Sequence, residues 1–502
     1  MDQQFEELRR RLGTIADLNT AASLLVWDEE TKMPPGGAEA RAEQRATLNR
    51  IAHELQIAPD LGELLESLRD VEAAHDHDSF EASLIRVARR DFEKQARVPA
   101  ELRAEMTRAG SRGYRAWLEA REAKDFGILL PHLERRIELA REYVACFAPA
   151  GDPYDVLLDD YEPGMKTAEV ETVFARLRDV LVPLIAAVAE QQPVDDSCLR
   201  GSYPVDAQRQ FALAVMTEWG LDDRSWRLDD TVHPFAVSLS SADIRLTTNL
   251  ADGDLSGVLS CLHEFGHGLY ERQVDPGYFR TPLAGGVSSA FHESQSRLWE
   301  NLVGRSLATW RHFYPRLREA FPDALRDVPL ETFHRALNTV KPTMRRVDSD
   351  EVTYCLHIIL RFELERDIFS GRIAVADLAE AFDAKMQQYL GLRPADAVEG
   401  VLQDVHWADS DFGYFPTYAL GNVISVQLWE RARAELGDLD EQFARGEFAA
   451  LREWLGRRVH RFGRALEPGE LLERAVGGPL DPEPYLAYLR AKLAGLYGVA
   501  AT

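Results

Sequence analysis

The sequence predicts a mainly α-helical protein, organised as one large domain over residues 1–502 with two helical lobes around a deep central cleft and a small β-sheet. Three observations lead to this fold class. Apolar residues recur at three- and four-residue steps through most of the chain, apolar–polar alternation is confined to one stretch, and no segment repeats at a fixed period. The length would allow roughly two to four domains, but the composition stays even and the Gly and Pro clusters are short.

Long segments with the helical period make up most of the chain. The predicted helices span about residues 1–30, 38–56, 80–95, 99–124, 128–148, 167–191, 206–219, 254–273, 288–306, 330–340, 349–371, 375–391, 423–436 and 447–462. Helix therefore dominates the predicted fold.

The exception to the helical pattern is the stretch 231–249. Apolar and polar residues alternate over 235–239 and again over 244–248, on either side of a polar break at 240–243. Alternation with a polar break predicts a β-hairpin. It lies directly before the predicted helix 254–273, and the edge of such a sheet can pair with an extended peptide.

The most informative motif is His263-Glu264-Phe265-Gly266-His267, within the predicted helix 254–273. Two histidines four residues apart lie on the same helix face and can bind one metal ion, while the glutamate between them acts on a metal-bound water. A single buried histidine is more often a hydrogen-bonded core residue. The pair favours a metal site, because two imidazoles and a carboxylate on so apolar a helix would otherwise be desolvated without compensation.

A third ligand is needed, and the next predicted helix offers two candidates. Glu293 and Glu300 are seven residues apart and lie on about the same face, so either can complete the site while the other is a surface or supporting residue. Two histidines and one glutamate form the ligand set of catalytic zinc peptidases, whereas a closed structural zinc site needs a fourth protein ligand. The residues thus favour a zinc-dependent hydrolase.

Charge and cysteine content restrict the partners and the compartment. The formal net charge is −25, from 58 basic and 83 acidic residues spread along the chain, which disfavours nucleic acid and anionic membranes as partners. The N-terminus lacks the basic and apolar regions of a signal peptide, and no apolar run approaches the roughly 18 residues that span a bilayer. We expect a cytoplasmic protein without disulfides, since only four cysteines are scattered along the chain: Cys146, Cys198, Cys261 and Cys355.

The chain resembles the carboxypeptidase Taq family of thermostable metallocarboxypeptidases nearly from end to end. Short signatures of that family occur in the family's order: Trp27-Asp28 with Met33-Pro34 and the segment 36–41, His233-Pro234-Phe235, Asp243-Ile244-Arg245-Leu246-Thr247, the metal helix, His292-Glu293-Ser294-Gln295, and Gly400-Val401-Leu402-Gln403-Asp404-Val405-His406-Trp407. The resemblance implies that Glu293 is the third metal ligand.

One signature departs from the family pattern. The family has an aliphatic residue followed by Arg-x-x-Ala-Asp, whereas this chain has Arg345 at the aliphatic position and Ser349 at the alanine, before Asp350. Two adjacent arginines, Arg345 and Arg346, are therefore candidates for binding a substrate carboxylate. The resemblance favours Arg346, which aligns with the family's arginine.

Family membership would imply release of C-terminal amino acids from peptides with a free C-terminus, one divalent metal ion per chain, and a homodimer. Zn²⁺ is the expected metal, with Co²⁺ as the alternative. Glu264 would be the general base, Arg346 would bind the substrate α-carboxylate, and His406 with either Tyr414 or Tyr418 would stabilise the oxyanion.

Three further residues of the signatures are expected to contact substrate: His233, Arg245 and Gln403. For Arg245 we favour a pair with Asp243 that braces the hairpin over direct catalysis. Trp407 and Phe415 are expected in the core or the pocket wall.

Two other functions compete with the carboxypeptidase. One is a cytoplasmic zinc oligopeptidase or endopeptidase of similar helical fold, which would release fragments longer than one residue. The other is a helical binding or scaffolding protein with a degenerate site, although none of its predicted ligands has been substituted.

Overall fold

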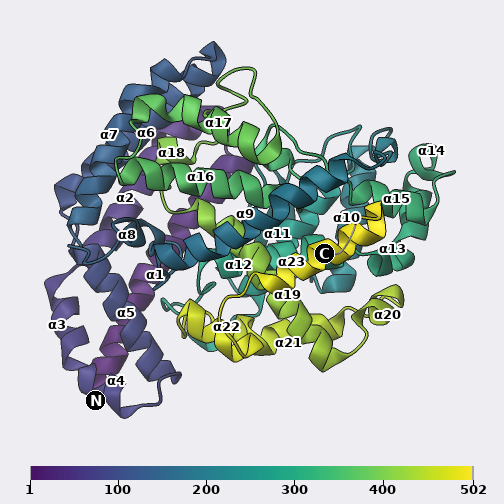
Figure 1. Ribbon diagram of the computed structural model, residues 1–502. Helices are drawn as coiled ribbons and strands as arrows, with labels where there is room; N and C mark the ends of the chain where they lie inside the picture. The colour runs from purple at the N-terminus through teal and green to yellow at the C-terminus, as the bar shows by residue number, and fades with distance from the viewer. Residues whose placement is uncertain (1, 500–502) are drawn as a thin grey trace. The chain divides into compact units, whose positions relative to one another are not determined.

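The computed structural model describes residues 2–499 and confirms a mainly α-helical protein with one small sheet (Figure 1). Contacts within the chain divide it into two compact units, each built from three segments. Unit 1 comprises Met1–Ala96, Asp195–Leu337 and Leu428–Gly478, and unit 2 comprises Arg97–Val194, Asn338–Gln427 and Pro479–Thr502.

Unit 1 contains the sheet and the helix with the histidine pair. Its helices and strands are α1 (Asp2–Thr31), α2 (Ala38–Gln56), α3 (Pro59–Ser67), α4 (Arg69–Ala74), α5 (Phe80–Ala96), α10 (Val205–Trp219), β1 (Trp226–Asp230), β2 (Ala236–Ser240), β3 (Asp243–Thr248), α11 (Ser256–Arg272), α12 (Ser289–Arg297), the π-helix η4 (Leu298–Val303), α13 (Leu307–Ala320), α14 (Pro322–Leu325), α15 (Leu330–Leu337), α20 (Leu439–Ala444), α21 (Ala449–Arg458) and α22 (Pro468–Val476).

Unit 2 is helical in its described part. Its helices are α6 (Ala100–Ala123), α7 (Phe126–Ala145), α8 (Tyr154–Leu158), α9 (Thr167–Ala189), the short 3₁₀ helix η5 (Arg346–Asp348), α16 (Tyr354–Phe369), α17 (Leu378–Leu390), α18 (His406–Asp409) and α23 (Glu483–Tyr497). Helix α19 (Phe415–Leu436) begins in unit 2 and continues past the boundary at Leu428.

Most predicted helices are present, and the differences have local causes. Helix α19 begins at Phe415 rather than near 423, because Pro416 occupies its first turn, where a proline without an N–H is tolerated. The predicted helix 349–371 begins only at Tyr354, because the Asp350 carboxylate accepts hydrogen bonds from the N–H groups of Val352 and Thr353 and forms a turn there. Helices α3, α4, α8, α13, α14, α18, α20, α22 and α23 were not predicted.

The predicted hairpin is confirmed as strands β2 and β3, which pair antiparallel from Ala236↔Leu246 to Ser240↔Asp243. The sheet has a third strand that was not predicted, because β1 is rich in charged residues and pairs with β3 in parallel from Trp226 to Asp230. The strand order is β1-β3-β2. The sheet packs on α11 at Gly268, where a Cβ would lie 2.5 Å from the Trp226 ring.

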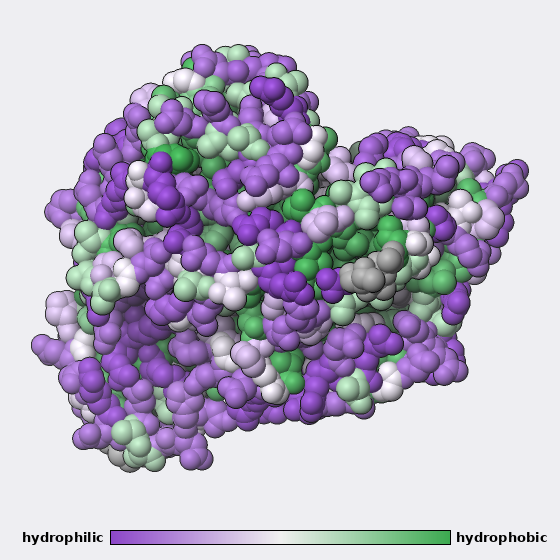
Figure 2. Space-filling model, in the orientation of Figure 1, coloured by the Kyte–Doolittle hydropathy of each residue, from purple (hydrophilic) through white to green (hydrophobic). Residues whose placement is uncertain are grey.

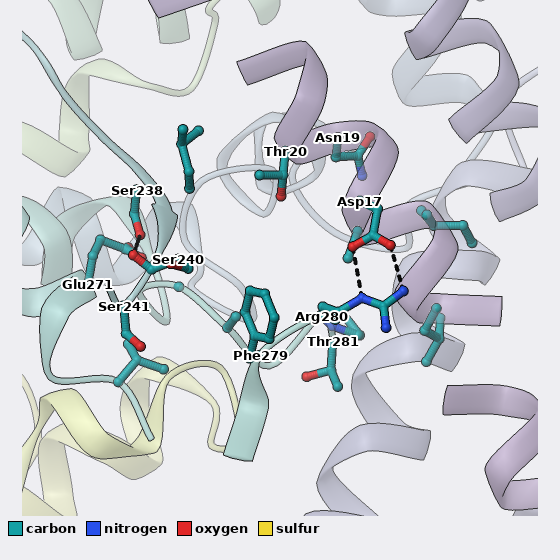
Figure 3. A pocket seen from close by; sticks show the side chains of 18 of the residues that line it. Asp17, Asn19, Thr20, Ser238, Ser240, Ser241, Glu271, Phe279, Arg280 and Thr281 are labelled. Atoms are coloured by element: carbon teal, nitrogen blue, oxygen red, sulfur yellow. Dashed lines mark hydrogen bonds and ion pairs between the residues drawn. The ribbon is translucent and has the colours of Figure 1, made fainter. Parts of the chain in front are cut away.

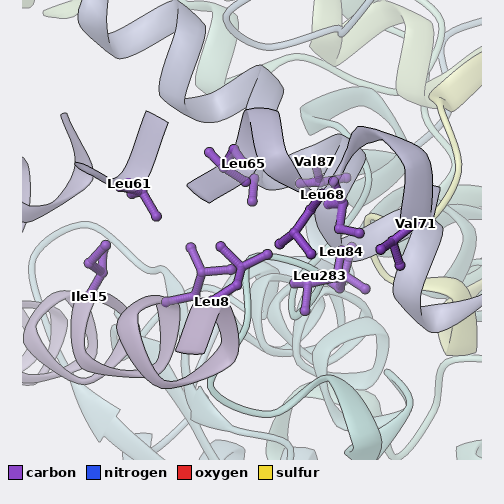
Figure 4. Close-up of a cluster of buried hydrophobic side chains, with 12 residues drawn as sticks. Leu8, Ile15, Leu61, Leu65, Leu68, Val71, Leu84, Val87 and Leu283 are labelled. Carbon is purple, nitrogen blue, oxygen red and sulfur yellow. The ribbon is translucent and has the colours of Figure 1, made fainter. Parts of the chain in front are cut away.

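A hydrophobic cluster holds the first helices of unit 1 together (Figure 4). It joins side chains of α1, α3, α4 and α5 to Leu283, which follows α11 in the chain. The buried members are Leu8, Leu12, Ile15, Leu61, Leu65, Leu68, Val71, Leu84, Ile85, Val87, Ala88 and Leu283. The N-terminal helices are thereby anchored to the segment that links α11 to α12.

The surface agrees with the charge of the chain, since hydrophilic residues predominate on the face drawn in Figure 2. Within residues 2–499, every helix is too short or too polar to cross a bilayer. All four cysteines are free, and Cys261 is fully buried with its sulfur 3.1 Å from the Thr248 hydroxyl.

We expect Gly266→Ala to destabilise unit 1. A Cβ at this position of α11 would lie 2.4 Å from the Gln295 carbonyl oxygen and 2.6 Å from the Ser296 Cα in α12. Backbone atoms cannot rotate aside as a side-chain tip can, so the free energy of unfolding should fall by about 1–3 kcal/mol. Thermal unfolding monitored by circular dichroism measures the effect.

The matched control is Gly469→Ala, at an exposed glycine of α22 with no atom within 4 Å of an added Cβ. The thermal unfolding midpoint of the Gly469→Ala variant should equal that of the parent or be slightly higher. Equal midpoints for the Gly266→Ala variant and the parent would contradict the close packing of α11 on α12.

Candidate metal centre and active site

Helix α11 presents His263, His267 and Glu271 on one face, because they follow each other at four-residue steps. Helix α12 can approach this face closely only because residue 266 is a glycine. The approach brings the Glu293 Oε2 atom to 3.6 Å from His263 Nε2 and 3.4 Å from His267 Nε2.

These three side chains form a cluster that can hold a metal ion. Their potential ligand atoms all lie within 4.8 Å of one another, and two imidazoles with one carboxylate suit Zn²⁺ with a further position for water. Burial lowers the pKa of His267 to about 4, which keeps that imidazole neutral. For Glu293 burial acts the other way, but the Arg297 guanidinium and His263 lower the pKa of its carboxyl well below the usual range.

Glu300, the alternative third ligand, lies on the other side of the His263 ring. Its Oε2 atom is 2.9 Å from His263 Nδ1, so it accepts a hydrogen bond there and orients Nε2 toward Glu293. Glu300 lies in the π-helix η4, where the predicted continuous helix 288–306 changes its winding. Arg297 and Arg305 also bind this carboxylate, and although burial opposes them, they and His263 lower its pKa well below the usual range.

His267 is oriented by a longer chain of hydrogen bonds. His267 Nδ1 is 2.7 Å from His292 Nδ1, and His292 Nε2 is 2.8 Å from Glu271 Oε1. Because the carboxylate accepts, His292 carries its proton on Nε2 and accepts at Nδ1 from His267. His267 Nε2 therefore keeps its lone pair free for a metal. Neither His292 nor Glu271 was assigned this role from the sequence.

Glu264 is buried, and its Oε2 atom has no hydrogen-bond partner among the described residues. Burial raises the pKa of its carboxyl to about 7, and the Glu293 carboxylate acts in the same direction. A buried carboxylate oxygen without a partner among the described residues, next to a cluster that could hold a metal, fits a group that would accept the proton of an attacking water.

The hairpin residues act mainly as braces. Arg245 forms a bidentate pair with Asp243, with both N–O distances 2.9 Å, as we favoured from the sequence. Its guanidinium also lies 4.4 Å from the centre of the Trp27 ring, which ties β3 to α1. His233 is exposed in the turn before β2.

Unit 2 contains a second cluster, centred on Asp404. Arg346 is buried, and its Nε and Nη2 atoms lie 2.9 and 2.8 Å from Asp404 Oδ1 while Nη1 donates to the Tyr354 hydroxyl at 3.0 Å. Arg361 binds the other carboxylate oxygen of Asp404. Arg345 is instead exposed and pairs with Asp348 at 3.5 Å, so the two adjacent arginines differ clearly in environment.

Gln403 supports this cluster. Its Oε1 atom accepts from the Arg346 N–H at 3.2 Å and from Arg361 Nη2 at 3.0 Å, and its Nε2 donates to the Met344 carbonyl at 2.8 Å. The side chain of Gln403 therefore positions Arg346. Asp404 and Arg361 were not among the residues predicted from the sequence, although Asp404 belongs to the same signature as Gln403.

The remaining predicted residues of unit 2 surround His406. Its Nε2 atom is 3.3 Å from the Tyr418 hydroxyl, and its ring stacks on Tyr414 with centroids 5.6 Å apart. Burial lowers the pKa of His406 to about 4, so the imidazole is neutral at pH 7. The Tyr418 ring also lies 5.0 Å from the Arg346 guanidinium, so the arginine, the histidine and both tyrosines form one cluster.

A pocket of about 550 Å³ lies in unit 1 and is lined in part by Glu271 (Figure 3). Serines of β2 and the turn after it line one side, and the bidentate ion pair between Asp17 and Arg280, with N–O distances of 2.8 and 2.5 Å, lies on another. The Glu271 carboxylate thus belongs both to the pocket wall and to the chain of hydrogen bonds that reaches His267.

The chain is similar to known metallocarboxypeptidases along almost its whole length. The model of the family described as carboxypeptidase Taq (M32) metallopeptidase matches residues 7–493. The chain is 42% identical over 508 residues to thermostable carboxypeptidase 1 of Thermus thermophilus, with 99% of each chain covered. It is 35% identical over 498 residues to carboxypeptidase 1 of Bacillus subtilis, with 99% of this chain and 98% of that protein covered.

A solved structure is similar over the same length. The crystal structure of the M32 carboxypeptidase from Deinococcus radiodurans R1 superimposes with a TM-score of 0.96 at 42% identity, covering 99% of this chain and 100% of that one. The match includes both units.

We expect Zn²⁺ to stabilise the metal-free protein through the cluster in unit 1. An ion that binds only the folded chain at 100 times its Kd adds about 2.7 kcal/mol to the free energy of unfolding. His267→Ala removes one ligand and should abolish most of the increase in thermal midpoint. Differential scanning calorimetry of chelator-treated protein, with and without Zn²⁺, measures this increase in thermal midpoint.

His312→Ala is the control, since His312 also bonds a carboxylate, that of Glu218, but lies outside the cluster. It should keep the full increase with Zn²⁺. An equal increase in the His267→Ala variant would show that the stabilising ion binds elsewhere.

Proposed function

The chain belongs to the carboxypeptidase Taq (M32) family of metallopeptidases, and on this basis we propose that it is a metal-dependent carboxypeptidase that releases single amino acids from the C-terminus of peptides. One observation carries the proposal. Two partly buried imidazoles and a buried carboxylate, those of His263, His267 and Glu293, lie beside a carboxylate oxygen of Glu264 that has no hydrogen-bond partner among the described residues.

His263, His267 and Glu293 would hold one divalent ion, for which Zn²⁺ is our choice and Co²⁺ the alternative. Such an ion lowers the pKa of a bound water to about 7 and polarises the scissile carbonyl. Glu300 orients His263, and His292 with Glu271 orients His267. The outer residues hold the ligands ready, which reduces the reorganisation needed on metal binding.

Glu264 would act as the general base. Its free oxygen can accept the proton of the water that attacks the carbonyl, and the carboxyl can then deliver that proton to the leaving amine. A pKa near 7 suits both steps, because the group can gain and lose the proton near neutral pH.

Arg346 would bind the α-carboxylate of the substrate's last residue. Asp404 and Tyr354 use three of its five N–H groups, which leaves one on each terminal nitrogen. Two such N–H groups can bind a carboxylate in a bidentate manner. Asp404 and Gln403 keep the guanidinium in place before substrate arrives.

His406, Tyr414 and Tyr418 would donate hydrogen bonds to the oxyanion of the tetrahedral intermediate. A neutral His406 and a tyrosine hydroxyl are donors of the required kind, and their mutual contacts limit their motion. His233 would contact the peptide from the turn before β2, while Arg245 and Gln403 would serve the substrate site as braces.

We further propose that residues 1–502 form one catalytic domain, in which both units serve the same reaction, and that the enzyme is a cytoplasmic homodimer. The family match spans both units, from residue 7 to residue 493. The net charge of −25 and four free cysteines favour a reducing compartment and disfavour nucleic acid or an anionic membrane as a partner.

A ladder of peptides analysed by mass spectrometry tests the proposed activity. We expect loss of single C-terminal residues, no cleavage of the same peptides with an amidated C-terminus, loss of activity with a chelator, and recovery with Zn²⁺. Fragments longer than one residue, or equal cleavage of amidated peptides, would favour an oligopeptidase instead.

The Glu264→Gln variant tests the proposed general base in the same assay. It keeps the shape of the side chain but cannot accept a proton, so we expect kcat to fall by about 10²–10⁴-fold while Zn²⁺ still raises the thermal midpoint. A Glu264→Gln variant as active as the parent would rule out this residue as the base.

Arg346→Met and Arg345→Met distinguish the two adjacent arginines. Truncating a buried arginine that binds a carboxylate should weaken transition-state binding by about 2–5 kcal/mol, seen as a lower kcat/KM. The exposed Arg345 should tolerate the same change within about twofold, as isolated surface charges usually do. Steady-state kinetics on one peptide with a free C-terminus distinguish the two arginines. A kcat/KM equal to that of the parent in both variants would contradict a role of Arg346 in substrate binding.

A further inference from the structure

Glu365 in α16 is a fully buried carboxylate that the proposed reaction does not use. Its hydrogen-bond partners are three neutral donors, and no ion pair to it is found within the described residues. A buried charge without a cation is unfavourable unless hydrogen bonds compensate for the lost water. Burial accordingly raises the pKa of this carboxyl to about 7.

The donors come from two places in unit 2. Trp407 Nε1 donates to Oε1 at 2.7 Å, and the Gly413 N–H donates to Oε2 at 2.9 Å. The Tyr154 hydroxyl of α8 also donates to Oε2, at 2.5 Å. One carboxylate therefore binds both ends of the segment 407–413 and links that segment to α8.

The residues on either side of this segment are those proposed to stabilise the oxyanion. His406 directly precedes Trp407, and Tyr414 directly follows Gly413. Their rings stack with an interplanar angle of 23°. The distance between the two rings thus depends on how the two ends of the segment are held.

The segment also closes tightly on itself and on α8. The Asp411 N–H donates to the His406 carbonyl at 2.9 Å, and Gly413 has a φ of +89°, which a side chain rarely tolerates. A Cβ at Gly413 would lie 2.6 Å from the backbone of Leu157 in α8. The segment has little room to shift without breaking its bonds to Glu365.

We propose that Glu365 is a positioning residue, which holds His406 and Tyr414 in register for catalysis by binding Trp407 and Gly413 with its two carboxylate oxygens. The inference rests on the proposed function, because it needs His406 and Tyr414 to act on the transition state.

Only a group with two acceptor atoms can satisfy this arrangement. A glutamine in either orientation turns its NH₂ group toward an N–H donor, that of Trp407 or that of Gly413, and one end of the segment is released. Displacement of reacting groups by about 1 Å can lower a rate by about 100-fold.

The test compares Glu365→Gln with Glu363→Gln in steady-state peptide hydrolysis. Glu363 lies two residues earlier in α16 and binds Arg178, Lys385 and Tyr389, outside the proposed site. We expect kcat of Glu365→Gln to fall by about 10–100-fold with KM nearly unchanged, and Glu363→Gln to keep kcat within about twofold. Circular dichroism and the Zn²⁺-induced increase in midpoint verify folding.

A second variant tests whether the two changes act through the same contact. Trp407→Phe removes the indole N–H and so releases one end of the segment from Glu365. We expect Trp407→Phe alone to lower kcat, and the double variant Glu365→Gln/Trp407→Phe to lose less than the product of the two single losses, because both changes break one shared contact. Two independent losses of stability would multiply instead.

The outcomes separate the two proposals. The positioning role is overturned if Glu365→Gln has the kcat of the parent while His406→Phe has a greatly reduced kcat. That result leaves the proposed carboxypeptidase activity unaffected. Equal kcat losses in Glu365→Gln and Glu363→Gln, or a loss in the double variant equal to the product of the two single losses, also overturn the positioning role. If the parent itself releases no C-terminal residue, the proposed function fails instead, and the positioning role fails with it.

Discussion

The close contact between α11 and α12 at Gly266 is the interaction on which the candidate metal centre depends. Without a Cβ at this position, the backbone of Gln295 and Ser296 can lie against α11, and Glu293 then reaches both imidazoles. The same contact buries the ligands, which is unfavourable for polar groups unless each has a partner. The surrounding residues supply these partners on the outer side of each histidine ring.

The two histidines are supported differently, and the difference follows from the elements around them. His263 meets a carboxylate directly, because the π-helix η4 places Glu300 beside it. His267 meets another imidazole, and the carboxylate that fixes the tautomer comes from its own helix one turn later. That residue, Glu271, also lines the pocket in Figure 3.

Buried carboxylates organise unit 2 in two contrasting ways. Asp404 lies between Arg346 and Arg361, and although burial opposes them, these arginines lower the pKa of its carboxyl far below the usual range. Among residues 2–499 Glu365 has neutral donors only, and burial raises the pKa of its carboxyl to about 7. The first carboxylate positions a guanidinium that keeps free donors, and the second positions the segment between a histidine and a tyrosine. Each of these carboxylates is itself hydrogen-bonded through both of its oxygens, to side chains or backbone of unit 2.

The sequence by itself determined the fold class, most helices, the hairpin and the pair of histidines that can share a metal, because these depend on local periodicity or on spacing along one helix, and its short signatures indicated the family. His263, Glu264 and His267 share a helix, so their common face follows from the helical period alone. Tertiary structure decided what the residues around them do. It separated Glu293 from Glu300, buried Arg346 while leaving Arg345 exposed, and joined Glu365 to Gly413 across 48 positions in the chain. Such hydrogen bonds between distant segments leave no periodic pattern, and neither do the parallel strand β1 or the π-helix, so only the packed chain defines them.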